Sequence, residues 1–407
     1  MANIYVFNVC KVKDYRILWT VGILNSSARW LEIIIFSVLT WQWFGDATYA
    51  GSLFALRMIA ISLTGLIFSL VSNHFSGQKI MFWTQAAVAA CCLISSLCMN
   101  FEKEYGFYSL CILSLLSGAL WSLDFSYRRR MLADTLSVDQ VVSGISLDVV
   151  SSHATRFIGT LVGGIILTFF DNSTIFLILA ATYLIACAMI VRVRDKALKS
   201  SRKLTLNEEI SSVIQQAKKS IPILTVLLIT PVFNIFALPY IALIPLIYIE
   251  KFNSAEFLTG LLTSSEGIGA VFGGLLISVF IKTKLVFVFA LIIMTLLLTI
   301  YLGSISENIY LFTFLIICTG ALTSAYSTMQ SSIIYTTSQK KLRSATFSVL
   351  TISIGLGFIG GTNTSWIAQD SSVSDIAKTI AIQGFFSLAL VCSVLILLKF
   401  KSDNQKN

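Results

Sequence analysis

The feature that most constrains the fold is a pair of opposite charges, Arg29 and Glu32, inside an apolar run from about residue 17 to residue 43. A run of this length can cross a bilayer, whereas a charge at membrane depth costs at least ~2.5 kcal/mol. The three-residue spacing places both charges on one helix face, with Asn25 a turn earlier and Phe36 a turn later. We therefore expect this helix to face a protein interior or a water-filled cavity that the rest of the chain encloses.

Apolar runs recur along all 407 residues, and only 12% of the residues are charged, compared with roughly 25% in a soluble domain. We mark twelve of them, at about residues 17–40, 49–72, 79–100, 106–127, 144–170, 172–192, 221–249, 255–281, 284–303, 308–337, 345–368 and 378–398. The sequence thus predicts an all-α polytopic membrane protein with 12 transmembrane helices in two pseudo-symmetric halves, residues 1–192 and 221–407. The polar linker at 193–220 contains the capping-box pattern Thr205-Leu-Asn-Glu208, which predicts a short amphipathic helix up to Lys219.

Most of the basic residues fall on one side of the predicted membrane. They precede the first segment, follow every second segment and fill the linker: Lys11, Lys13, Arg16, Lys79, Arg128, Arg129, Arg130, Arg192, Arg194, Lys196, Lys199, Arg202, Lys203, Lys218, Lys219, Lys282, Lys284, Lys340, Lys341, Arg343, Lys399, Lys401 and Lys406. The alternate loops carry mostly acids. The positive-inside rule therefore predicts that both termini and the linker are cytoplasmic. It also accounts for the net charge of +9 without a nucleic-acid partner.

An internal repeat favours the division into halves. When the second segment is laid on the eighth, the residues that coincide are Gly51 and Gly260, Gly65 and Gly274, Ser69 and Ser278, and Arg57 and Glu266. Two parallel halves of six helices are typical of transporters with internal repeats.

Other classes of protein leave no signature in the sequence. The eight cysteines lie in or beside apolar runs and show no metal-type pairing, so we interpret them as reduced packing residues. No phosphate loop, helical zinc motif or nucleophile elbow is present, so we expect neither an enzyme nor a cofactor or metal site. The polar first 16 residues do not form a cleavable signal peptide.

Three groups of motifs carry a resemblance to a known family. They are Asp14-Tyr15-Arg16-Ile-Leu-Trp19, then Arg156-Phe-Ile-Gly159-Thr-Leu-Val-Gly163-Gly164, and Ala237-Leu-Pro239-Tyr240 with Gly267-Ile-Gly269-Ala-Val-Phe-Gly273-Gly274. Together they resemble the major facilitator superfamily over nearly the whole chain, and look most like its branch of macrolide efflux pumps and enterobactin-type siderophore exporters. The chain departs from the family pattern at Asn73 and His74, where an acid and an Arg are usual, and at Thr160, where the antiporter signature has a Pro.

The resemblance implies that helices 1, 4, 7 and 10 line a cavity, that helices 2, 5, 8 and 11 join the halves, and that the others face outward. The intramembrane charges agree, because they occur on helices 1, 2, 4, 5 and 8 and avoid the outward ones. We predict an ion pair between Arg156 and Glu266 and another between Arg57 and Glu32. The candidates for proton coupling or gating are Arg57, Asp124, Asp148, Arg156 and Glu266. Static pairs that only aid assembly are the alternative, and Asp124 has the further alternative of neutralising Arg128.

Small residues at helical spacing predict close helix packing where helices 5 and 8 meet. They are Gly159, Gly163, Gly164, Gly269 and Gly273.

The predicted substrate cavity combines polar, charged and aromatic side chains of helices 1, 7 and 10. They are Asn25, Arg29, Trp30, Glu32, Asn234, Tyr240, Ser327 and Gln330. Ordinary packing is the alternative for the aromatic residues. Because both signs of charge occur, the sequence indicates neither a purely anionic nor a purely cationic substrate. Pro222, Pro231, Pro239 and Pro245 predict a broken seventh helix, as is common beside transporter sites.

These features predict a secondary active transporter in the cytoplasmic (inner) membrane of a bacterium. The resemblance to the efflux and siderophore-exporter branch implies that it exports an amphipathic small molecule, a siderophore or a drug, in exchange for protons by alternating access. The alternatives are an importer of an iron chelate or metabolite with the same fold, and a non-transporting scaffold or sensor. The expected partners are the small-molecule substrate, protons and the lipid bilayer. We expect a monomer, and a periplasmic or outer-membrane partner stays open.

Overall fold

The computed structural model describes residues 9–71, 76–193, 206–280, 285–339 and 342–367, and residues 375–392 except 376, 377 and 380. All regular elements in this part of the chain are helices. They are α2 (Lys13–Phe44), α3 (Ala47–Val71), α4 (Gly77–Cys98), α5 (Lys103–Leu123), the π-helix η1 (Asp124–Arg128), α6 (Arg129–Asp134), α7 (Val138–Phe169), α8 (Asn172–Ile190), α9 (Leu206–Lys219), α10 (Ile221–Phe236), α11 (Tyr240–Glu250), α12 (Glu256–Phe280), α13 (Leu285–Ile305), α14 (Ile309–Thr337), α15 (Arg343–Gly355) and α16 (Gly357–Ile367). Residues 381–392 are helical as well.

Ten stretches of the described chain are long and apolar enough to cross a membrane. The chain is therefore an all-helical, multi-pass membrane protein, and the predicted total of twelve spans stays a prediction. The predicted linker helix is present as α9. The departure at Asn73 and His74 lies outside the described residues, as do the last six residues of the predicted twelfth span, 393–398.

Two of the predicted spans are broken. The seventh consists of α10 and α11, which the prolines explain: Pro231 lies inside α10, and Pro239 directly precedes α11. The break in the eleventh span, between α15 and α16, was not predicted. It lies at Leu356, between Gly355 and Gly357. A methyl group on Gly355 would lie 2.6 Å from the backbone nitrogen of Ser62 in α3, so close backbone packing, rather than proline, accompanies this break.

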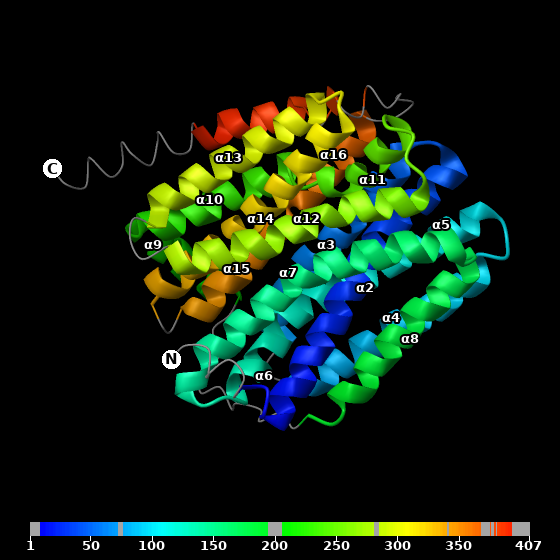
Figure 1. The fold of residues 1–407 in the computed structure, drawn as a ribbon. Coiled ribbons are helices and arrows are strands. Elements are labelled where there is room, and N and C mark those ends of the chain that lie inside the picture. Colours follow the sequence, from blue (N-terminus) through cyan, green and yellow to red (C-terminus); the bar gives the residue numbers. More distant parts are fainter. Residues whose placement is uncertain are drawn as a thin grey trace.

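The helices form two groups that lie side by side. Figure 1 shows α2 and α4–α8 together on one side and α10–α16 on the other. One large apolar core is built from residues between Val9 and Val193. The other is built from residues between Val226 and Val391, together with three residues of α2 and α3. Each predicted half thus has a core of its own, although the boundaries at 192 and 221 stay a prediction.

The two groups touch along three sets of helices: α7 packs on α12, α3 packs on α15 and α16, and α2 packs on α11. Several polar contacts join them at the end where α11 leads into α12. There Ser37 Oγ donates to the carbonyl oxygen of Ala242 at 2.9 Å, and Trp41 Nε1 donates to Glu250 Oε1 at 2.7 Å. The Gln42 amide also contacts the Glu256 carboxylate. The groups are therefore held together at this end of the bundle.

Two glycines meet where α7 and α12 approach each other closely. A methyl group on Gly164 would lie 2.6 Å from the Cα of Gly260, so the two backbones are in direct contact. The other glycines of the predicted packing set contact a helix of their own group: Gly159 and Gly163 lie against α2, and Gly269 and Gly273 lie against α14. Their expected place between the halves is therefore wrong. Successive residues of a helix point roughly 100° apart, so Gly163 and Gly164 face different neighbours.

We expect the Gly164→Ala variant to be less stable than the wild type by about 1–3 kcal/mol, because the added methyl meets backbone and forces α7 and α12 apart. The measurement is thermal unfolding of the purified protein in detergent. Gly303→Ala on α13 is the matched control, since its methyl would have no neighbour nearer than 3.9 Å. Equal melting temperatures for the two variants would contradict this account of the contact.

Candidate functional site

Glu32 of α2 is sealed inside the first group of helices. Its carboxylate accepts a hydrogen bond from Arg57 Nη2 of α3 at 2.6 Å and from Tyr183 Oη of α8 at 2.6 Å. The pair with Arg57 is the one that the sequence predicts. However, Glu32 has no exposed surface, so it does not line an opening in this conformation. Glu32 was predicted to line the substrate cavity, but in this structure it lies in a buried ion pair with Arg57.

Glu266 of α12 has the same kind of partners, but they come from different groups of helices. Its Oε1 accepts from Arg156 Nη1 of α7 at 2.8 Å and from Tyr240 Oη of α11 at 2.9 Å. The predicted pair with Arg156 is thus present, and it crosses the contact between the two groups. Both side chains are buried. A buried charge that loses its partner is strongly destabilising, so this pair couples the position of α7 to that of α12.

A third charge cluster centres on Arg128, which the sequence placed in a cytoplasmic loop. Arg128 does not lie in a loop, because it is only 1% exposed and ends the π-helix η1, while the predicted cytoplasmic side stays a prediction. Its Nε lies 2.8 Å from Asp124 Oδ1, and its Nη1 lies 2.7 Å from Asp148 Oδ1. Gly22 makes room for it, since a methyl there would lie 2.5 Å from the Arg128 Cζ. The one-turn spacing of Asp124 and Arg128 was the only feature of the sequence that indicated this ion pair.

The two aspartates proposed for gating are therefore partners of arginines near η1. Asp148 Oδ2 also contacts Arg129 Nε at 3.2 Å. Asn25 belongs to this cluster as well, because its Nδ2 donates to Asp124 Oδ1 at 3.0 Å and its Oδ1 accepts from Gln85 at 3.3 Å. Neutralisation of Arg128, the alternative given for Asp124, fits this geometry better than a gating role.

Among the described residues Arg29, unlike Arg57 and Arg156, forms no ion pair with a carboxylate. It is partly exposed, and its Nη2 donates to Ser26 Oγ at 3.1 Å. Its guanidinium lies 5.3 Å from the ring centre of Trp30 and 5.6 Å from that of Trp121 on α5. On the other hand, the Arg156 guanidinium lies 4.1 Å from the same Trp30 ring. Trp30 is therefore close to two cations. Sequence reasoning missed Trp121 because no charge or motif marks it.

Of the remaining predicted cavity residues, Gln330 joins α14 to α10, whereas Asn234 and Ser327 bond within their own helices. Gln330 Nε2 donates to Thr230 Oγ1 at 2.6 Å and to Tyr326 Oη at 3.0 Å. Asn234 Nδ2 donates to the carbonyl oxygen of Thr230 at 2.8 Å, and Ser327 Oγ donates to that of Ser324 at 3.1 Å. Within the described chain, no hydrogen bond joins these side chains to Arg29 or Trp30, so the structure does not bring the predicted set together as one site.

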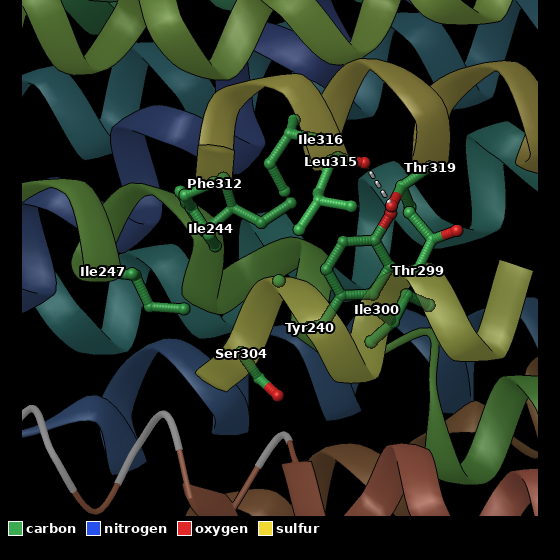
Figure 2. Close-up of a pocket in the computed structure, with 11 residues that line it drawn as sticks. Tyr240, Ile244, Ile247, Thr299, Ile300, Ser304, Phe312, Leu315, Ile316 and Thr319 are labelled. Carbon is green, nitrogen blue, oxygen red and sulfur yellow. Dashed lines mark hydrogen bonds between the residues drawn. The ribbon is translucent and has the colours of Figure 1, made fainter. Parts of the chain in front are cut away.

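Tyr240 also lines an apolar pocket behind Glu266. Figure 2 shows its ring near Thr319 of α14 and Thr299 of α13, with Leu315 and Ile316 beside it. The hydrogen bond drawn there runs from Thr319 Oγ1 to the carbonyl oxygen of Leu315 at 2.8 Å. The other predicted cavity residues do not line this pocket. Its free volume of about 10 Å³ leaves room for no more than a water molecule.

The paired intramembrane charges and the two contacting groups of helices define a polytopic membrane protein with a transporter-like architecture. The model of the Major Facilitator Superfamily matches residues 18–362, so the chain belongs to this superfamily. That membership points to transport rather than to catalysis. A comparison with curated protein sequences gave no match.

Solved structures show the same fold. The nucleoside transporter NupG superimposes with a TM-score of 0.71 at 13% identity, over 95% of this chain and 99% of that chain. A POT family transporter in complex with a thioalcohol-conjugated peptide gives a TM-score of 0.69 at 11% identity, over 94% of this chain and 95% of that chain. At such low identity the likeness shows the fold alone.

We expect Arg128→Met to lower the free energy of unfolding by about 3–5 kcal/mol, because it leaves two buried aspartates without their shared cation. Arg192→Met, which removes an exposed charge, is the control and should change stability by less than about 0.5 kcal/mol. Adding Asp148→Asn to Arg128→Met should restore part of the loss. Thermal unfolding in detergent decides the matter, and an Arg128→Met variant as stable as the control would contradict the assignment.

Proposed function

We propose that the protein is a secondary active transporter that exports an amphipathic small molecule from the cytoplasm in exchange for protons. The observation that carries the proposal is the buried Glu266 carboxylate, which is held by Arg156 from one group of helices and by Tyr240 from the other. A carboxylate in this position is sensitive to any movement of the two groups relative to each other.

The proposed mechanism couples this pair to alternating access. The contacts near Gly164 and Gly260 keep the groups together at the end where α11 leads into α12. Opening that end requires α7 and α12 to separate, which removes Arg156 from Glu266. A buried carboxylate without a cation is costly, so it takes up a proton. Return of Arg156 favours release of that proton, which links the direction of proton flow to the rocking of the two groups.

The proposed topology has twelve spans, with both termini and the linker 193–220 in the cytoplasm and the chain in the cytoplasmic membrane of a bacterium as a monomer. Figure 1 supports it in one respect, because α6 and α9, which adjoin the basic segments, lie toward one end of the bundle. The junction of α11 and α12, where the acids Glu250 and Glu256 lie, is at the other end. This distribution follows the positive-inside rule.

The proposed substrate is a drug or a siderophore, as the motif resemblance to macrolide efflux pumps and enterobactin-type exporters implies. A strain lacking the protein should retain siderophore in the cytoplasm or become more sensitive to macrolides. The measurements are siderophore content of washed cells and growth inhibition across a drug panel.

We expect Glu266→Gln to abolish proton-driven export of the compound so identified, while exchange of that compound across the membrane without a pH gradient persists. An amide cannot take up the proton, yet it keeps the size of the side chain. Everted membrane vesicles with a pH-sensitive dye provide the measurement. Glu307→Gln is the control, since its side chain is 89% exposed. Normal proton-coupled transport by Glu266→Gln would refute the role of this carboxylate.

A further inference from the structure

The charges around Trp30 carry an inference about the class of substrate, which rests on the proposed transport function. Three arginines, Arg29, Arg57 and Arg156, approach the middle of α2. Arg57 is neutralised by Glu32 at 2.6 Å, and Arg156 by Glu266 at 2.8 Å. Among the described residues Arg29 forms no ion pair, and its hydrogen bond goes to Ser26. The centre of the bundle therefore has one positive charge in excess, although both signs occur in the sequence.

Asp124 is the acid that acts electrostatically on Arg29, but its carboxylate is already engaged. Its Oδ1 lies 2.8 Å from Arg128 Nε and accepts from Asn25 Nδ2 at 3.0 Å. Because Arg128 is nearer, this aspartate compensates Arg128 first. It leaves the Arg29 guanidinium without an acceptor that carries charge.

Two further hydrogen-bond donors at Trp30, like the Arg29 guanidinium, lack an acceptor. The Trp30 Nε1 and the Arg156 Nε are both buried and have no hydrogen-bond partner. Indole and guanidinium groups are donors only, so the group that satisfies them has to be an acceptor. Buried donors left unsatisfied cost free energy, and a negatively charged oxygen is the acceptor that these cationic surroundings favour most.

We propose that Arg29, Trp30 and Arg156 bind the carboxylate of an organic anion, and that the substrate of the transporter is of this class. The planar fork of a guanidinium matches a carboxylate with two parallel hydrogen bonds. The rings of Trp30 and Trp121, both within 5.6 Å of the Arg29 guanidinium, provide apolar faces for the body to which the carboxylate is attached. An amphipathic anion satisfies the donors and the rings together.

The test compares an aromatic carboxylate with its neutral amide, 2-naphthoate with 2-naphthamide, by calorimetric titration of the purified protein. We expect the wild type to bind the carboxylate roughly 10- to 100-fold more tightly than the amide, as hydrogen bonds to a charged group imply. Arg29→Gln should lose this preference. Arg16→Gln, which removes an exposed charge from the same helix, should keep it. Melting temperatures verify that each variant is folded.

A second variant keeps the test decisive if Arg29→Gln does not fold. Trp30→Phe retains an aromatic ring and removes the Nε1 donor, and it should weaken binding of the carboxylate more than binding of the amide. The inference is overturned if the wild type shows no preference, if a folded Arg29→Gln keeps it, or if inorganic phosphate binds as tightly as 2-naphthoate, which would indicate a site for free anions. Failure of the transport proposal would be separate, because proteoliposomes that move neither solute nor protons leave the binding preference unchanged.

Discussion

Inside this helix bundle a carboxylate needs an arginine, and that requirement fixes how the helices are joined. Glu32, Asp124, Asp148 and Glu266 each lie within 2.8 Å of an arginine nitrogen. A buried ion pair contributes little net stability compared with well-packed apolar residues, but breaking it is expensive. The pairs therefore specify which helices must be neighbours, while close packing between the helices holds the bundle together in lipid.

Glu32 and Glu266 show how the same chemistry supports two different roles. Each accepts hydrogen bonds from one arginine and one tyrosine. The partners of Glu32 come from α3 and α8, which lie with α2 in the predicted half before the linker, so a movement of the two halves relative to each other leaves them in place. The partners of Glu266 come from both groups. The Arg57–Glu32 pair therefore fixes how helices assemble within one half. The Arg156–Glu266 pair crosses the contact between the two groups, so it would respond to the proposed movement of one group relative to the other.

Much of this could be predicted from the sequence, because membrane depth makes charges rare and spacing informative. The helical class, the linker helix, the proline break in the seventh span and the pairs at Arg57 and Arg156 follow from local pattern and electrostatics. The place of Arg128 does not, since it depends on the π-turn of η1 and on the missing side chain at Gly22. The contact of Gly159 and Gly163 with α2 likewise could not be predicted, because it depends on how α7 is rotated about its axis. The spacing of small residues shows that they share one helix face, but it does not show which helix packs against that face.

In the sequence, Arg29 is unusual as a charge inside an apolar run. In the structure, it is unusual because no carboxylate among the described residues pairs with it. The arginines at positions 57, 128 and 156 are each stabilised by a carboxylate. Arg29 is stabilised instead by a hydrogen bond to a serine and by two indole rings. A permanent acid at this point would stabilise the arginine and remove its affinity for an anion. A cation–π environment stabilises the arginine by only about 0.5–2 kcal/mol, so the guanidinium stays available to bind an anion.

Arg156 contacts the same Trp30 ring as Arg29 and also holds Glu266. An anion bound at Trp30 would therefore compete with Glu266 for Arg156. In the proposed mechanism, binding of the anion and release of the Glu266 pair are thereby joined through one arginine, as proton-driven exchange requires.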